Sequence, residues 1–355
     1  MIGYSLVFNK KKNPFIGGLD NAFFIGVDDH PSPVTDSLPS IIFAIYQGMS
    51  AAITPAFIFG SIVERDRVVP SIVFIFIWTT VVYDPIAYWT CNPNGWIYQL
   101  GSLDFAGGIP AHTSSGIAAL VYSIIIGRRH GYEKNKEIEP QNIINATFGT
   151  FLIWFGWFGF NGGSALGANS RAAIACTVTN LAAVSGGLTW MFFDYRTKKK
   201  LSILGFCSGT ITGLVAITPG SGYVSIPSSV IFGFIAAASC RFAVKLKYFF
   251  DYDDTLDVFA IHGIGGFIGN LMTGIFAQKS IAALDNINIS GGLLDGNWMQ
   301  IIYQFTASVV GIVYSLLITA AILLIMNITP GLSLRSKKED EEEGIDKSEL
   351  GESVY

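Results

Sequence analysis

The sequence predicts an all-α polytopic membrane protein. Its 355 residues are 51% hydrophobic and only 14% charged, whereas soluble domains contain about 25% charged residues. Apolar stretches that could cross roughly 30 Å of hydrocarbon as helices recur along most of the chain. The 39 glycines fit the same class, because small residues let membrane helices approach one another closely.

The predicted spans fall within one transmembrane domain, residues 39–330. It follows a polar N-terminal segment at 1–38, expected outside the cell, and precedes an acidic tail at 331–355, expected in the cytoplasm. We expect about nine spans, at 39–61, 69–90, 105–127, 141–161, 172–193, 202–218, 224–246, 258–277 and 300–327. The first residues have neither a charged region nor a long apolar one, so we expect no signal peptide.

The basic residues predict the orientation of the chain. Of the 22 Lys and Arg residues, 17 fall in one alternate set of loops, and loops rich in Lys and Arg face the cytoplasm. With nine crossings, the N-terminus is then outside the plasma membrane and the C-terminus is cytoplasmic. The sequon Asn288-Ile289-Ser290 lies in an external loop, where it is either a glycan site or an unmodified loop.

Composition excludes several kinds of partner. No basic cluster resembles a nucleic-acid surface, so no nucleic acid is expected. The four cysteines are scattered without metal-ligand spacing, so we expect them to act as small apolar side chains. We expect neither a metal nor another cofactor. The acidic run at 339–343 cannot bury a core by composition. The tail is then either solvated or docked on the cytoplasmic loops in a regulatory role.

Two histidines in matching contexts are the main clue to function. Asp104 precedes His112 by eight residues, and Asp254 precedes His262 by the same spacing, both within apolar sequence. Ionisable groups inside a bilayer are costly and mark functional sites by default, although a structural role for the pair stays open. Burial favours the uncharged imidazole, so a hydrogen-bonded pair suits proton transfer or an uncharged guest. His30 is expected to be a solvated loop residue.

The aspartates allow two interpretations. Asp104 precedes a helix start, where a carboxylate can accept hydrogen bonds from unpaired N–H groups. It could instead attract a cation. Asp254 is more simply a cap, and Asp84 lies near the outer end of its span without an evident role.

Aromatic residues end the span at 141–161. They could form the usual interfacial belt. Alternatively, Phe160 and a nearby ring form a cation–π seat, with the Ser164 hydroxyl accepting a hydrogen bond from a cation.

Several long motifs resemble the ammonium transporter (Amt/Mep/Rh) family, most closely the fungal and other eukaryotic methylammonium permeases. They are DFAGG from Asp104 with His112, WFGFNGGS from Trp157, GFCSG from Gly205, TPGSG from Thr218, and DVFAIHG from Asp257.

The resemblance implies eleven spans, two inverted five-helix halves, a homotrimer, and ammonium or methylammonium as the substrate. It also implies that His112 and His262 are the twin histidines of the pore. Asp104 would then shape the external cation site, Ser164 would hydrogen-bond the ammonium, and Phe160 would be one of two stacked gate rings.

The chain departs from the family pattern at three places. The second family span ends in a motif like Gly3–Phe8, so the first span and most of the second would be missing. Lipid or a partner would then fill the gap. Ser50 aligns with the upper gate phenylalanine, and Cys91 aligns with the tryptophan that flanks the external cation site.

Three functional hypotheses follow. The first is an ammonium transporter in the lipid bilayer, in which ammonium loses its proton at the outer vestibule and ammonia and the proton pass the twin histidines. The second is a non-conducting or ammonium-sensing paralogue that joins trimers of full-length relatives, or a truncated gene product. The third, a metalloenzyme, is disfavoured, because an aspartate eight residues before a histidine lies about two helical turns away.

Overall fold

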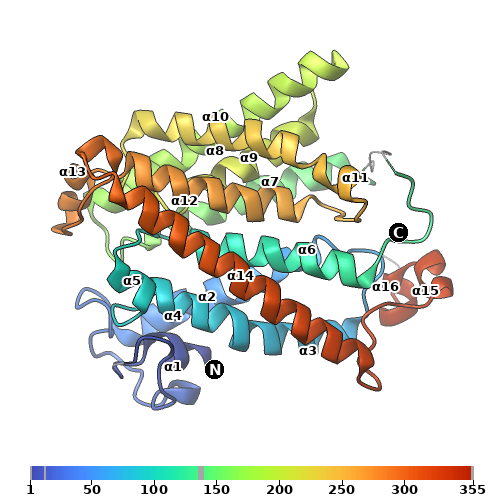
Figure 1. Cartoon of the computed structure of the whole chain (residues 1–355), viewed down its shortest axis with the longest axis horizontal. Coiled ribbons are helices and arrows are strands. Elements are labelled where there is room, and N and C mark those ends of the chain that lie inside the picture. The colour runs from blue at the N-terminus through green and yellow to red at the C-terminus, as the bar shows by residue number, and fades with distance from the viewer. Residues whose placement is uncertain (1, 12, 135–139, 353–355) are drawn as a thin grey trace.

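The computed structural model describes residues 2–11, 13–134 and 140–352, and they form an all-helical protein (Figure 1). In this part of the chain, eight helical segments are long and apolar enough to cross a membrane. A ninth apolar helix, Ile203–Ile217, is shorter. The nine predicted spans correspond one by one to these segments, and the stretch at 202–218 is the short one.

The first half of the chain contains α1 (Gly3–Phe8), α2 (Ser40–Phe59), α3 (Val68–Trp78), α4 (Asp84–Cys91), α5 (Trp96–Leu100) and α6 (Ser114–Ile126). The second half contains α7 (Ile143–Trp157), α8 (Ser170–Lys198), α9 (Ile203–Ile217), α10 (Ile226–Ala243), α11 (Leu246–Phe250), α12 (Gly265–Phe276) and α13 (Lys279–Ala282). The long α14 (Met299–Ile328) follows, and α15 (Lys338–Glu343) and α16 (Ile345–Leu350) complete the tail. Short 3₁₀ turns lie at Ala22–Phe24, Ala283–Asp285 and Leu293–Asp295.

The helices form two layers, α1–α6 and α7–α12, and α14 runs obliquely across them (Figure 1). The layers touch most closely where α6 meets the turn that carries His262. A Cβ on Gly116 would lie only 2.1 Å from the backbone nitrogen of Gly263, so any side chain there would force the helices apart. The two small residues therefore permit the crossing that brings both histidines to one place.

Within the described residues, four π-helical turns interrupt the helices: η2 (Thr79–Tyr83), η3 (Gly108–Thr113), η4 (Phe158–Gly162) and η5 (Phe259–Ile264). Such turns are rare and concentrate at functional sites, because the wider turn redirects side chains. Three of the four carry residues that the sequence singled out, namely His112, Phe160 and His262. The fourth leads directly into Asp84.

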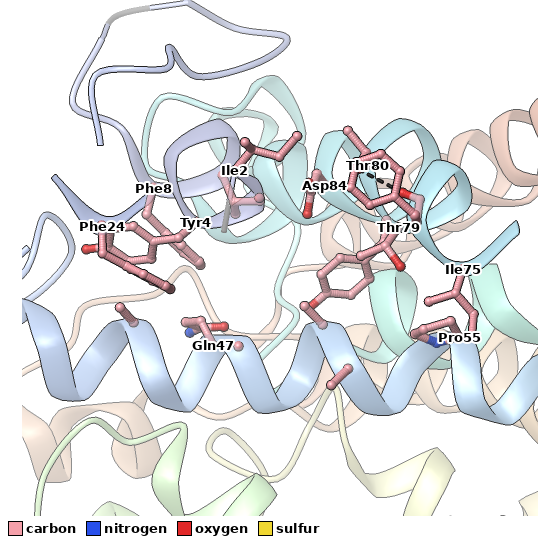
Figure 2. A pocket seen from close by; sticks show the side chains of 18 of the residues that line it. Ile2, Tyr4, Phe8, Phe24, Gln47, Pro55, Ile75, Thr79, Thr80 and Asp84 are labelled. Carbon is pink, nitrogen blue, oxygen red and sulfur yellow. Dashed lines mark hydrogen bonds between the residues drawn. The ribbon is translucent and has the colours of Figure 1, made fainter. Parts of the chain in front are cut away.

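Asp84 faces a groove of about 520 Å³ that lies among α1, α2 and α3 (Figure 2). Its side chain is buried, and its Oδ2 atom has no hydrogen-bond partner among the described residues. The other walls are mostly apolar and aromatic, and Tyr4, Phe24 and Pro55 contribute to them. The first layer thus contains an open groove beside α2.

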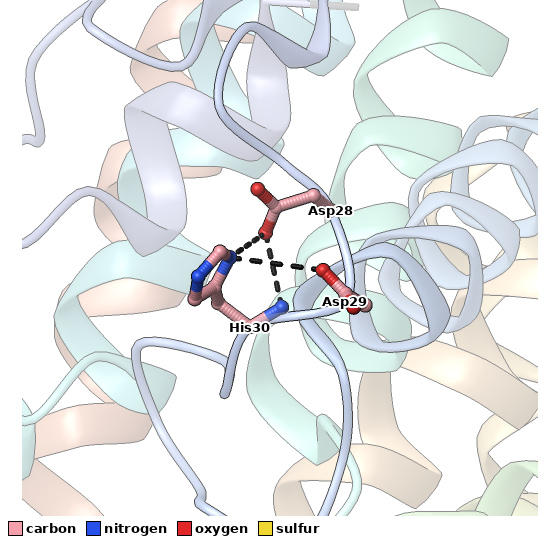
Figure 3. Close-up of side chains that lie close together, drawn as sticks. All are labelled: Asp28, Asp29 and His30. Carbon is pink, nitrogen blue, oxygen red and sulfur yellow. Dashed lines mark hydrogen bonds and ion pairs between the residues drawn. The ribbon is translucent and has the colours of Figure 1, made fainter.

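In the N-terminal segment, α1 is largely buried against the first layer. His30 is confirmed as an exposed loop residue, with a side-chain exposure of 80%. Its Nδ1 atom lies 2.8 Å from Asp28 Oδ1, with Asp29 nearby (Figure 3). The hydrogen bond to Asp28 raises the pKa of His30.

The tail packs against the body of the protein instead of being fully solvated. Leu334 and Ser336 are buried, and the Ser336 backbone N–H donates to the Arg65 carbonyl at 3.1 Å. Arg335 donates to both carboxylate oxygens of Glu341, at 2.7 and 3.1 Å. The carboxylate of Glu341 also accepts from the His130 backbone N–H at 3.0 Å. Docking on the adjoining loops is therefore present in the structure.

Candidate functional site

The two histidines meet inside the protein between the layers. His112 Nδ1 and His262 Nδ1 lie 3.3 Å apart, a hydrogen-bond distance that requires one nitrogen to donate and the other to accept. His112 is fully buried and His262 is 7% exposed. The Nε2 atom of His112 has no partner among the described residues. It therefore remains available to a proton or a small polar guest.

Aromatic rings hold the imidazoles in place. Trp157 stacks on His112 with ring centroids 5.1 Å apart and an interplanar angle of 20°. Phe57 stacks on His262 at 4.3 Å and 27°. The indole N–H of Trp157 donates to Thr218 Oγ1 at 2.9 Å, which fixes the ring plane. The surroundings of the pair are thus rigid and apolar.

The two aspartates cap the turns that carry the histidines. Asp104 accepts hydrogen bonds from the backbone N–H groups of Gly107, Gly108 and Ile109 at 3.0, 2.6 and 2.8 Å. Asp254 accepts from Val258 and Phe259 at 3.0 and 2.8 Å. The predicted capping role of both residues is confirmed. For Asp104, an additional attraction for a cation stays a prediction.

Burial affects the two carboxyl groups in the same direction. It raises the pKa of Asp104, and the three backbone N–H donors only partly oppose this. The pKa of Asp254 is raised to about 6, first by burial and then by the neighbouring charge of Asp257. Asp104 follows α5 and Asp254 follows α11, and these two helices lie at opposite ends of the molecule (Figure 1), which agrees with an inverted relation between the halves.

A cavity of about 410 Å³, the vestibule cavity, brings the remaining predicted residues together. Its lining includes Ser50, Cys91, Asp104, Phe160 and Ser164. The sequence placed these residues on four different segments, so their convergence is a result of the fold. Ser50 and Cys91 present small side chains where the family resemblance implies aromatic rings.

Tyr46 also lines this cavity, a position that the sequence did not predict. Its hydroxyl donates to the Phe160 carbonyl at 2.5 Å, and the Ser164 hydroxyl donates to the same oxygen at 2.9 Å. The two hydroxyl oxygens lie 2.8 Å apart. Because the carbonyl takes both protons, the oxygen lone pairs remain as acceptors for a guest that can only donate.

Phe160 separates the vestibule cavity from the histidines. Its ring centroid lies 6.1 Å from that of His112, and the residue lines cavities on both sides. The second cavity, of about 540 Å³, runs between α2 and α7 and includes Met49, Ile153 and His112 in its lining. Met49 is 70% exposed, so the cavity opens on the side of the helical body.

Neither Phe57 nor the stacking of Trp157 on His112 was predicted from the sequence. Both contacts join segments far apart in the chain, and a phenylalanine in an apolar span carries no signal of its own. A helical spacing of 11 residues places Phe57 three turns after Tyr46 on one face of α2. That spacing is the one feature that could have linked both residues to the pore.

The fold and the site together define a polytopic membrane protein in which an acceptor-lined cavity leads to a buried imidazole pair. A sequence profile of the Ammonium Transporter Family matches residues 1–355. Ammonium transporter 1 of Schizosaccharomyces pombe is 48% identical over 99% of this chain and 71% of its own length. Ammonium transporter MEP2 of Saccharomyces cerevisiae is 44% identical over 99% of this chain and 72% of its own length.

A solved structure agrees. The crystal structure of Candida albicans Mep2 superposes with a TM-score of 0.91 at 46% identity, covering 95% of this chain and 75% of that one. The chain belongs to the ammonium transporter family, and among its relatives are the fungal Mep transporters. It spans about three quarters of the length of these relatives.

Proposed function

We propose that the protein transports ammonium across a membrane. The cation enters the vestibule cavity, where the oxygens of Tyr46 and Ser164 accept its hydrogen bonds near the carboxylate of Asp104. It then loses a proton, and ammonia passes Phe160 to reach the pair of His112 and His262. The observation that carries the proposal is this imidazole pair, 3.3 Å apart in an apolar interior below an acceptor-lined cavity.

The geometry explains how such a site selects its substrate. Ammonium and potassium are cations of similar size, so a cavity of fixed dimensions separates them poorly. Ammonium can lose a proton, whereas potassium cannot shed its charge. An apolar passage with uncharged imidazoles penalises any ion. The proton travels separately, along the linked imidazoles and water.

Replacement of either histidine tests the proposal. We expect His112→Ala and His262→Ala each to reduce methylammonium uptake by transporter-null cells at least about tenfold, because the remaining imidazole loses its buried hydrogen-bond partner, which costs about 1–3 kcal/mol. His30→Ala is the matched control, since that histidine is exposed and remote from the pore. Uptake at the wild-type rate in both pore variants, with normal surface expression, would refute the pore assignment.

We further propose a membrane location, a topology, an assembly and an alternative substrate for this transporter. The protein resides in the plasma membrane, with residues 1–38 outside, the transmembrane domain at 39–330, and the tail at 331–355 in the cytoplasm. It assembles as a homotrimer or with full-length relatives, and methylammonium is an alternative substrate. Family membership supports the assembly and the substrates, and the distribution of basic residues supports the orientation.

A non-conducting or regulatory relative is the second candidate, and one observation favours it. Ser50 and Cys91 line the vestibule cavity without the aromatic rings that the resemblance implies for these positions. Co-expression with a full-length fungal transporter separates the two functions. A regulatory subunit co-purifies with that partner and changes its flux, while a transporter restores uptake alone.

A further inference from the structure

A buried arginine lies in the wall of the vestibule cavity. Arg171 is only 5% exposed, and its guanidinium carbon lies 4.7 Å from the ring centroid of Phe105 and 4.9 Å from that of Tyr223. Its Nε atom donates to the Gly222 carbonyl at 2.9 Å, and an Nη atom lies 3.8 Å from Asp285. Two aromatic rings, a carbonyl oxygen and a carboxylate thus surround the guanidinium.

This arginine does not stabilise the helix that carries it. Arg171 is in the first turn of α8, where the positive end of the helix dipole disfavours cations. The capping requirement of this turn is met by Asn169, whose side chain accepts from the Ala172 N–H at 2.8 Å. The energetic reason for a cation at this position therefore lies in its tertiary contacts.

The surroundings of the guanidinium are built closely around the Phe105 ring. A Cβ on Gly222 would lie 2.2 Å from that ring, so any side chain at this position would displace the ring. The Phe105 backbone N–H also donates to the Pro219 carbonyl at 2.9 Å. Phe105 directly follows Asp104, which caps the turn of His112. The contacts of Arg171 therefore reach the loop that shapes the entrance to the pore.

We propose that Phe105, Tyr223, Gly222 and Asp285 form a seat for a planar organic cation, which the protein fills with its own Arg171, and that this residue thereby determines specificity at the vestibule. Filling the seat keeps free organic cations of the guanidinium class out of the cavity. It also holds the Asp104 loop in position. The effect on specificity rests on the proposed transport function, whereas the seat itself does not.

Emptying the seat tests the proposal through binding. We expect 10 mM guanidinium chloride to raise the melting temperature of purified Arg171→Ala by about 2–4 °C relative to 10 mM sodium chloride. The wild-type protein should show no difference between the two salts. Adding Phe105→Leu to Arg171→Ala should abolish the shift, because one aromatic face is lost. Arg196→Ala is the matched control, since it removes the same side chain from the exposed far end of α8.

Uptake measurements test the positioning effect. In Arg171→Ala we expect the KM for methylammonium to rise about tenfold, with a smaller change in the maximal rate. Added guanidinium should return the KM most of the way to the wild-type value. If Arg171→Ala does not accumulate, the neutral variant Arg171→Gln is measured instead. Guanidinium should also raise its melting temperature.

Several results would overturn the seat. A guanidinium shift in the wild type or in Arg196→Ala as large as the shift in Arg171→Ala would do so, as would the absence of a shift in a folded Arg171→Ala or Arg171→Gln protein. Failure of the wild type to transport would instead count against the proposed function, and the binding result would still decide the seat.

Discussion

The hydroxyl of Tyr46 provides a test of the vestibule at the scale of one residue. Its oxygen and that of Ser164 keep acceptor lone pairs because both protons go to the Phe160 carbonyl. Tyr46→Phe removes one acceptor and leaves the ring in place. We expect the KM for methylammonium to rise about tenfold to a hundredfold, because one hydrogen bond to a cation contributes about 1.5–3 kcal/mol. Tyr98→Phe, which changes another tyrosine of the same cavity, should leave KM unchanged. A KM that falls in Tyr46→Phe would contradict the acceptor role.

At the same scale, the sequence predicted the ionisable residues of the site and missed its apolar members. His112, His262 and Asp104 stand out because titratable groups are rare in apolar spans. Phe57 and Tyr46 do not, since aromatic residues are common in such spans and their role depends on contacts across the bundle. Arg171 appeared only as one of five Lys and Arg residues on the less basic side. The stacking on Phe105 and Tyr223 needs tertiary structure to be seen.

Asp104 caps the helix start that carries His112, so replacing it should lower the stability of the protein by an amount that depends on the substituted residue. Asp104→Ala leaves three N–H groups without their acceptor, and we expect it to destabilise the protein by about 1–2 kcal/mol. Asp104→Asn keeps a good capping side chain, so it should lower the free energy of unfolding by less than half as much as Asp104→Ala does. Thermal unfolding of both purified variants gives the comparison, with Asp29→Asn in an exposed loop as the control. Equal destabilisation by Asn and Ala would show that the charge, not the cap geometry, carries the effect.

The tail helix α15 should respond to pH through Glu341. Burial alone would raise the pKa of this carboxyl, but hydrogen bonds from Arg335 and the His130 N–H outweigh it and lower the pKa. The stabilisation is therefore present above the ordinary value of 4.5 and is lost as the pH falls below it. At neutral pH, Glu341→Gln should speed proteolysis within 338–350 about threefold to fivefold.

Glu342→Gln is the matched change for this helix, because that side chain is 62% exposed and its ion pair, with Lys338, lies within the helix itself. Its proteolysis rate should stay near that of the wild type. Identical rates for Glu341→Gln and the wild type at neutral pH would show that the ion pair does not hold the tail. Composition alone could not predict this docking, since an acidic run indicates solvation unless its basic partners are known.

For the whole molecule, hydropathy sufficed to predict the number and order of the spans. Burial in an apolar solvent requires each span to satisfy its backbone hydrogen bonds internally, so length and composition determine the helices. The π-helical turns and the two layers depend on side-chain contacts between helices and were not predictable in this way. The open groove beside α2 is likewise a product of how the helices pack and not of any single span.

The orientation of the whole molecule leads to a prediction about its two ends. Asn288 is exposed and lies near α13, whereas the tail docks at the opposite end (Figure 1). If the α13 end is external, a yeast-expressed protein should carry an endoglycosidase-sensitive glycan that Asn288→Gln removes. Lys200→Asn, which creates a sequon with Leu201 and Ser202 at the other end of α8, should add none. A C-terminal tag should be digested only after the cells are permeabilised. A glycan on the Lys200→Asn variant, or digestion of the tag on intact cells, would reverse the orientation that the basic residues predict.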